Sequence, residues 1–152
     1  MTLFLVDNSV IQRIDKPQVR DAWMRLHDRG EIATCLPLLL EAGYSARSKD
    51  DYERLIDLEQ RAKVVLPPSP EIVEIALDLQ HALFGAGMGR AVGVSDLQIA
   101  ATALYHSTGS QPVVVLHYDA DFDHLVAVAP RLRVEWIVPR GAIDEHGRAD
   151  QS

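Results

Sequence analysis

The sequence has a single cysteine and no long apolar run, and both absences exclude classes of protein. Cys35 has no second cysteine with which to form an internal disulfide, and its apolar surroundings predict a buried free thiol. A membrane-spanning helix needs about 20 consecutive apolar residues, and no segment approaches that length. The first apolar stretch, residues 3–6, runs directly into Asp7 and does not resemble a signal peptide. We therefore expect a cytoplasmic protein with no membrane segment.

Basic and aromatic residues are also scarce. The chain has 15 Lys and Arg against 22 Asp and Glu, a formal net charge of −7. Proteins that coat nucleic acid non-specifically carry an excess of basic residues, so this function is excluded. Aromatic residues make up 6% of the chain and are not interleaved with basic ones, so the sequence shows no stacking platform for bases. A selective nuclease remains possible if a metal ion screens its acidic site.

What is present is an ordinary globular composition, with 152 residues of which 47% are hydrophobic. This length and composition predict one domain, residues 1–140, followed by a polar C-terminal tail, residues 141–152. Apolar strand patterns alternate with helical patterns, which is typical of an α/β fold with a parallel sheet. We expect Gly30 to end a helix and Ser95 to cap the start of another. The predicted strands are residues 3–6, 32–35, 64–66, 113–116 and 132–138, and the predicted helices are residues 9–14, 18–28, 37–47, 50–62, 70–84, 95–104 and 122–127.

Two aspartates follow predicted strands. Asp7 comes directly after residues 3–6, and Asp119 comes shortly after residues 113–116. In open parallel sheets ligands bind beyond the carboxyl ends of the strands, so both side chains are expected at that edge. They become neighbours if the two strands are adjacent. The alternative is that Asp7 caps the next helix and Asp119 shapes a turn.

Two further acids interrupt apolar helices. Glu41 follows three leucines, and a buried carboxylate in such surroundings needs a compensating partner. It can instead lie on the solvated face of its helix. Asp96 begins an alanine-rich helix, where it also complements the helix dipole. Because Ala100 and Ala103 share its side of the helix, that side can press close to the sheet and carry Asp96 inward.

Other side chains close to these four acids in the sequence are weaker candidates for the site. Asp121 can add an oxygen ligand because it lies close to Asp119, whereas Asp123 is expected to be solvated or capping. His117 is favoured as a structural residue over a site residue. Ser9 either hydrogen-bonds a metal-bound water or phosphate, or caps the following helix. The histidines lack the spacing of a zinc site.

Clustered carboxylates raise each other's pKa and call for a counter-charge. Mg²⁺ or Mn²⁺, which prefer oxygen ligands, supply it, so the pattern predicts a metal-dependent phosphodiester enzyme. A phosphatase of the haloacid dehalogenase type needs a second aspartate two residues after the first, but this position is Ser9. The competing hypothesis is a catalytically silent binding module whose acids attract a basic partner peptide.

The sequence resembles the PIN-domain family, and within it the VapC-type toxins of toxin–antitoxin pairs. The resemblance covers most of the chain and is carried by the Leu-Val-Asp-Asn-Ser-Val motif at 5–10, by Glu41, and by the segments at 95–103, 117–123 and 132–136. His117 departs from the threonine or serine of many relatives.

The resemblance implies a three-layer α/β/α domain whose parallel sheet has the strand order 3-2-1-4-5. It also implies a Mg²⁺- or Mn²⁺-dependent endoribonuclease that cuts structured RNA, either tRNA or rRNA, and inhibits translation. The implied partners are a VapB-like cognate antitoxin, the RNA substrate and a second copy of the chain in a homodimer.

In the predicted mechanism Asp7, Asp96 and Asp119 hold the metal. Asp121 supports the metal shell, and Glu41 binds metal through water or accepts the proton of the attacking water. We expect products with 5′-phosphate and 3′-hydroxyl ends. The phosphate clamps considered are Arg13, Arg47 and Arg90, with ordinary surface positions as the alternative.

Overall fold

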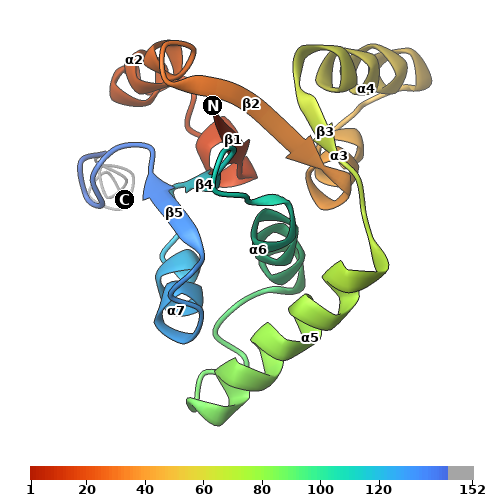
Figure 1. Cartoon of the computed structure of the whole chain (residues 1–152). Helices are drawn as coiled ribbons and strands as arrows, with labels where there is room; N and C mark the ends of the chain where they lie inside the picture. Colours follow the sequence, from red (N-terminus) through yellow and green to blue (C-terminus); the bar gives the residue numbers. More distant parts are fainter. Residues whose placement is uncertain (144–152) are drawn as a thin grey trace, which may run out of the picture.

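The computed structural model describes residues 1–143 and contains a five-stranded, all-parallel sheet in the order β3-β2-β1-β4-β5 (Figure 1). This confirms the predicted fold class and strand order. The strands are β1 (Thr2–Val6), β2 (Gly30–Cys35), β3 (Val64–Leu66), β4 (Val113–His117) and β5 (Arg133–Trp136). The helices are α1 (Asn8–Ile11), α2 (Pro17–Leu26), α3 (Leu36–Tyr44), α4 (Lys49–Ala62), α5 (Pro70–Gly85), α6 (Val94–His106) and α7 (Asp121–Val128).

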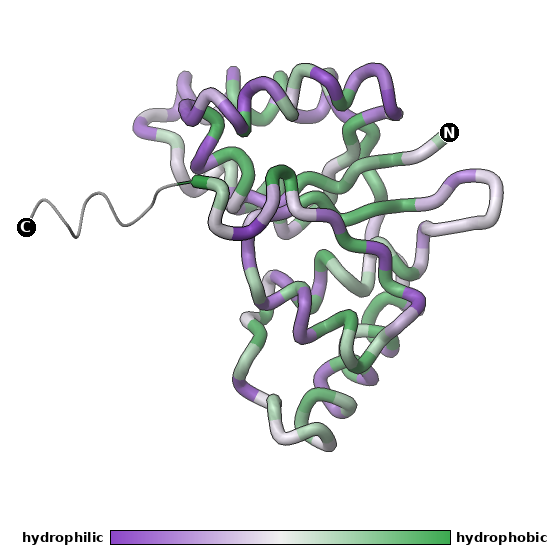
Figure 2. Tube along the Cα trace, turned by 90° about the vertical axis from the view of Figure 1, so that its left-hand side faces the viewer, coloured by the Kyte–Doolittle hydropathy of each residue, from purple (hydrophilic) through white to green (hydrophobic). Residues whose placement is uncertain are grey.

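The central strand β1 is apolar on both faces because helices cover both sides of the sheet. Leu3 and Leu5 point into a core cluster that includes side chains from α5, α6 and α7. The alternate residues Phe4 and Val6 point into a second cluster that includes side chains from α1 and α2. Figure 1 shows α2 and α6 on opposite sides of the sheet, and Figure 2 shows apolar stretches gathered in the strands at the centre.

The pairing of β1 with β4 brings the functional edge of the sheet together. The register aligns Val6 with Leu116, so the two strands end at nearly the same level. The backbone N–H of Asp7 donates a hydrogen bond of 2.9 Å to the carbonyl oxygen of Leu116. Residues directly after these two strands therefore lie side by side.

Two predicted helix boundaries are wrong. Gly30 does not end a helix but begins β2, where it pairs with Thr2. A Cβ atom at Gly30 would lie 2.2 Å from the carbonyl oxygen of Thr2, so this approach of the strands requires glycine. Ser95 is not the N-cap of its helix, because α6 begins at Val94 with Gly93 as its N-cap.

The predicted tail begins inside packed structure. Ile143 is buried in the same cluster as Phe4 and Val6, and the N–H of Ala142 donates to the carbonyl of Pro139. The other residues of the predicted tail, 144–152, lie outside the described residues. Within residues 1–143, none of the helices combines the length and apolar character needed to cross a membrane.

Candidate functional site

Asp7 is positioned by the end of β1 and the start of α1. Its side chain is 5% exposed, and its Oδ2 accepts a hydrogen bond of 3.0 Å from the backbone N–H of Ser9. Asp7 is therefore the N-cap of α1, as the capping alternative predicted. This role does not exclude a role in the site, because a carboxylate has lone pairs for more than one partner.

Asp119 is held in a short loop after β4. Its backbone N–H donates to Nδ1 of His117 over 3.1 Å, and its Oδ1 accepts from the N–H of Asp121 over 2.9 Å. The second bond is the turn-shaping role that the alternative reading predicted. The two bonds together fix the loop on either side of Asp119 and orient its carboxylate.

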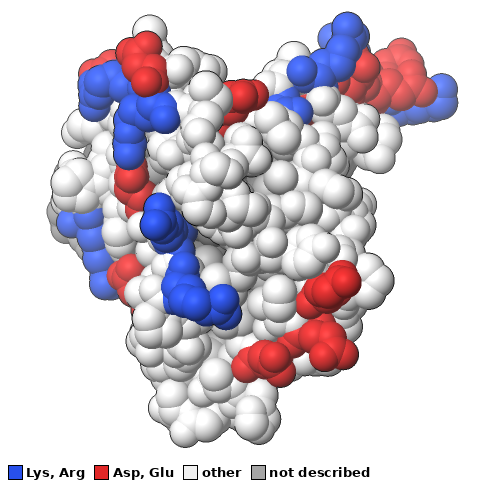
Figure 3. All heavy atoms as spheres, viewed as in Figure 1, with Lys and Arg blue, Asp and Glu red and all other residues white. Residues whose placement is uncertain are grey.

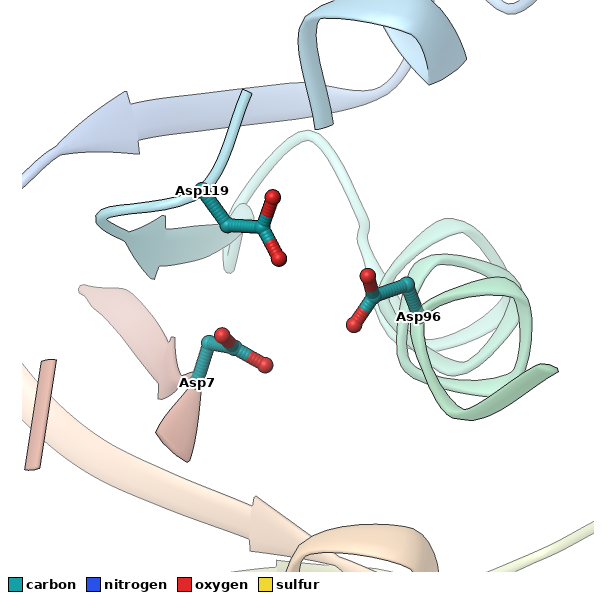
Figure 4. Close-up of side chains that lie close together, drawn as sticks. All are labelled: Asp7, Asp96 and Asp119. Carbon is teal, nitrogen blue, oxygen red and sulfur yellow. The ribbon is translucent and has the colours of Figure 1, made fainter. Parts of the chain in front are cut away.

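Asp96 reaches the same place from the first turn of α6. Ala100 and Ala103, on its side of the helix, are 0% and 1% exposed, so α6 packs closely as the alanines predicted. Figure 4 shows the carboxylates of Asp7, Asp96 and Asp119 facing a common point from three separate elements. One oxygen from each lies within 4.8 Å of the others.

Burial and crowding make this arrangement unfavourable while all three groups are charged. Burial is the largest cause that raises the pKa of Asp96 to about 8, followed by the charges of Asp7 and Asp119. Burial also raises the pKa of Asp7, and the charge of Asp119 adds to it. A divalent cation bound by these oxygens would remove the repulsion, and carboxylate oxygens are the ligands that Mg²⁺ and Mn²⁺ prefer. The donor set therefore fits such an ion.

Two other predicted acids flank the group of three. Glu41 on α3 is half-buried; burial and the charge of Asp7 raise its pKa, while a hydrogen bond from Ser95 lowers it. Asp121, at the start of α7, hydrogen-bonds with Asp96, and its pKa is raised by burial and by the charge of Asp119. The structure thus gathers all five predicted acids in one region.

Ser9 lies inside α1, so the prediction that it caps this helix is wrong. Its hydroxyl accepts a hydrogen bond of 2.9 Å from the backbone N–H of Tyr118 and also hydrogen-bonds the Asp7 carboxylate, which lowers the pKa of Asp7. Ser9 therefore connects the loop after β1 to the loop after β4. A contact with phosphate or a metal-bound water stays a prediction.

His117 has the structural position that the sequence favoured. It is 0% exposed, its ring lies 4.9 Å from those of Phe122 and Trp136, and burial lowers its pKa to about 4. Its Nδ1 accepts a hydrogen bond from the backbone N–H of Asp119, at the position where many relatives have threonine or serine. Asp123 accepts a hydrogen bond from the indole of Trp136 over 3.3 Å.

The three candidate phosphate clamps separate in space. Arg13 lines a hollow that also contains Asp119. Arg47 is in the connection between α3 and α4, where its backbone N–H donates to Asp51. Arg90 lines a different hollow, formed by residues 84–91 around Phe84. Arg13 alone of the three therefore lines the hollow that contains Asp119.

The sequence reasoning missed Tyr118, Trp136 and Arg140, which line the hollow with Arg13. Trp136 is paired with His117 in the register of β4 and β5, so it lies beside Tyr118 although 18 residues separate them in the chain. The position of Trp136 at the end of the last strand could have indicated this, because parallel strands end at the same edge of the sheet. Tyr118 and Trp136 form an aromatic pair here that the sequence did not indicate.

Comparison with known proteins agrees with this geometry. The model of the PIN domain family matches residues 4–128. Ribonuclease VapC21 of Mycobacterium tuberculosis is 37% identical over 141 residues, which cover 92% of this chain and 97% of the relative. Ribonuclease VapC51 of the same organism is 38% identical over 141 residues, which cover 93% of this chain and 97% of that relative.

Solved structures share the fold. VapBC-1 from nontypeable Haemophilus influenzae matches with a TM-score of 0.69 and 18% identity, over 90% of this chain and 98% of that one. DNA-bound VapBC from Salmonella typhimurium matches with a TM-score of 0.65 and 21% identity, over 91% of this chain and 100% of that one. At these identities the likeness concerns the arrangement of strands and helices.

Proposed function

Because the chain belongs to the PIN-domain family and, within it, to the VapC proteins, we propose that it is a metal-dependent endoribonuclease that acts as the toxin of a toxin–antitoxin pair. The observation that carries the proposal is the group of Asp7, Asp96 and Asp119, which bring one oxygen each to within 4.8 Å of one another. Relatives named ribonucleases match almost the whole chain, which supports the same chemistry here.

In this proposal Asp7, Asp96 and Asp119 hold Mg²⁺ or Mn²⁺. When bound, the cation polarises the scissile phosphate and lowers the pKa of an attacking water. Glu41 accepts the proton of that water, a role that suits its raised pKa, since a base with a pKa closer to neutrality keeps the proton more readily. Asp121, which lies within hydrogen-bond reach of Asp96, supports the metal shell.

This chemistry does not use the 2′-hydroxyl of the RNA as nucleophile. The products should therefore carry 5′-phosphate and 3′-hydroxyl ends, and cyclic phosphate ends would contradict the mechanism. We propose structured RNA, tRNA or rRNA, as the substrate and inhibition of translation as the result. A cytoplasmic location follows from this substrate and stays a prediction.

Partner surfaces complete the proposal. A hollow of about 440 Å³ beside Glu41 is lined by Leu40 and Tyr44, whose side chains are 60% and 93% exposed. We propose that a segment of a VapB-like antitoxin covers it and reaches the acidic site, because exposed apolar surface next to concentrated charge is typical of a binding face. On α5, Val73, Leu77 and Phe84 are exposed on one side of the helix and offer an apolar surface for a homodimer.

The test is cleavage of purified tRNA and rRNA by antitoxin-free protein with Mg²⁺, Mn²⁺ or EDTA. We expect discrete cuts that require metal and disappear in Asp96→Asn. The matched control is Asp78→Asn, the same substitution at an exposed position of α5, which should cut as the wild type does. Equal patterns for wild type and Asp96→Asn would contradict the proposed site.

The competing function is a binding module whose acids attract a basic peptide. The half-buried position of Glu41 beside an apolar hollow also suits that function. RNA cleavage distinguishes the ribonuclease from the binding module. A binding module can be stabilised by Mn²⁺, which then raises its melting temperature by binding the native state, but it leaves every RNA uncut.

A further inference from the structure

A second hollow opens at Asp119 and has a volume of about 810 Å³, and Glu41 is not among the residues that line it. Sites that enclose small organic ligands have volumes of about 300–1,000 Å³. Residues from three parts of the chain line this hollow: α1 and the turn after it, the loop after β4, and the end of β5 with the segment that follows it. It therefore adjoins the acidic group and has room for a ligand of nucleotide size.

The aromatic lining is held rigidly. The rings of Tyr118 and Trp136 meet edge to face with centroids 5.1 Å apart. The indole N–H of Trp136 donates to Oδ1 of Asp123 over 3.3 Å, and the buried ring of His117 packs 4.9 Å away. An aromatic ring fixed in this way loses little freedom when a flat ligand stacks on it.

Cationic side chains stand beside the same rings. The guanidinium of Arg13 lies 5.0 Å from the ring of Tyr118, and its Nη1 donates to the carbonyl of Ser9 over 2.8 Å. The guanidinium of Arg140 lies 5.8 Å from the ring of Trp136, and its side chain is exposed. Although the chain has a net charge of −7, two arginines therefore lie beside these rings in the hollow that contains Asp119.

The turn that carries Arg140 is tied to the aromatic lining. The N–H of Gly141 donates to the hydroxyl of Tyr118 over 3.1 Å, and the N–H of Ala142 donates to the carbonyl of Pro139 over 2.9 Å. Gly141 has φ +84°, a left-handed conformation that side chains disfavour. Arg140 is thus presented by a closed turn that packs against the rings.

We propose that this hollow binds one unstacked RNA nucleotide next to the scissile phosphate. Its base stacks on Trp136, and its phosphate is held by Arg140 and Arg13, because rings combined with cations are how proteins bind single-stranded nucleic acid. The inference rests on the proposed ribonuclease function and adds the place where one nucleotide of the RNA binds. The site takes RNA in a loop or bulge, where a base is free to leave its stack.

The test measures binding separately from cleavage. The protein carries Asp96→Asn and is kept in EDTA, so that RNA stays intact. Trp23→Phe leaves Trp136 as the one tryptophan, and a short single-stranded oligouridylate is titrated while its fluorescence is recorded. We expect saturable quenching, and Arg140→Glu should raise the dissociation constant about tenfold, the scale of one lost stacking or phosphate contact.

The matched control is Arg131→Glu, the same charge change just before β5 and so at the opposite end of that strand from Arg140. It should leave the dissociation constant within about twofold of the parent, as expected for a charge remote from the site. In the otherwise wild-type enzyme, Trp136→Phe keeps a ring against His117 and should raise KM while kcat is retained.

Absence of quenching, or equal weakening by Arg140→Glu and Arg131→Glu, would overturn the inference. Quenching by polyglutamate as strong as that by oligouridylate would overturn it in favour of an acidic peptide. The proposed function is judged separately: metal-dependent cleavage without this binding keeps the ribonuclease and removes the subsite. Binding without cleavage by the wild type keeps the subsite and removes the ribonuclease.

Discussion

The hydroxyl of Ser9 accepts a hydrogen bond of 2.9 Å from the backbone N–H of Tyr118, and this contact joins the loops that carry Asp7 and Asp119. The contact is buried, and the same hydroxyl also hydrogen-bonds the Asp7 carboxylate. One small side chain therefore sets the relative position of two acidic residues on different strands.

Ser9→Ala should destabilise the protein because it leaves the N–H of Tyr118 buried without its partner. A buried donor without a partner costs about 1–3 kcal/mol. Urea unfolding followed by circular dichroism should show that loss in the free energy of unfolding, and metal-dependent cleavage should fall with it. Ser45→Ala is the matched control, since the hydroxyl of Ser45 is exposed and donates to the carbonyl of Ala42. Equal unfolding midpoints for the two variants would contradict the linking role of Ser9.

Asp96 should make the metal-free protein less stable as the pH rises. Its pKa in the native state is raised to about 8, chiefly by burial, whereas an unfolded aspartate has a pKa of about 3.9. Between these values the native state holds a proton that the unfolded state has released, so the free energy of unfolding falls with increasing pH. Above about pH 6.5, where the opposite contribution of His117 is complete, melting temperatures in EDTA should therefore fall towards about pH 8.

Asp96→Asn removes this titration, so its melting temperature in EDTA should depend less on pH and exceed that of the wild type near pH 8. Added Mn²⁺ should reverse the order, because it raises the melting temperature when the ligands are intact. A wild-type protein whose pH dependence matches that of Asp96→Asn would show that Asp96 is not protonated in the native state.

His117 should make the protein less stable as the pH falls, the opposite direction to the effect of Asp96. Burial lowers its pKa to about 4 in the native state, whereas an unfolded histidine has a pKa of about 6.5. The unfolded state gains a proton first, so the contribution of His117 is complete above about pH 6.5 and is lost as the pH falls towards about 4. His117→Asn loses the packing of the ring but should reduce the pH dependence in this window, as measured by thermal melting. His27→Asn, the same substitution at an exposed histidine, is the matched control.

Gly141→Ala should cost stability because of its backbone alone. No atom lies within 4 Å of a Cβ built there, but φ is +84°, and a left-handed conformation costs a non-glycine residue about 1–2 kcal/mol. Gly109 also has open space around a built Cβ, and its φ lies outside the left-handed region. Gly109→Ala should therefore be neutral or stabilise by about 0.4–1 kcal/mol. Chemical unfolding compares the two, and a similar gain for both would show that the turn after Pro139 adapts at no cost.

Much of the fold follows from local pattern. Short apolar runs bounded by polar residues placed all five strands, and the acids after two of them marked the functional edge because parallel strands end together. The strand order came from the resemblance to a family, since apolar runs alone do not state which strands are neighbours. Charged residues on the surface do not state which elements are neighbours either. Figure 3 shows acidic side chains over α5 and mixed charges on the projecting α4.

The aromatic lining beside Asp119 shows where sequence reasoning stopped. Tyr118 and Trp136 meet because β4 and β5 pair with His117 opposite Trp136, and register is a property of tertiary structure. The misplaced helix end at Gly30 has the same origin. Gly30 is needed for the approach of Thr2 across the sheet, a contact invisible in the sequence around residue 30.

The central place of β1 has a consequence for synthesis of the protein. Ser9 and Tyr118 are 109 residues apart, and the strand that brings Asp119 beside Asp7 is the fourth of five. A chain emerging from the ribosome carries Asp7 and Glu41 long before β4 exists, so a partly made chain lacks a complete group of acids. The group of three aspartates is therefore complete only after Asp119 has been made, when more than three quarters of the 152 residues have been synthesised.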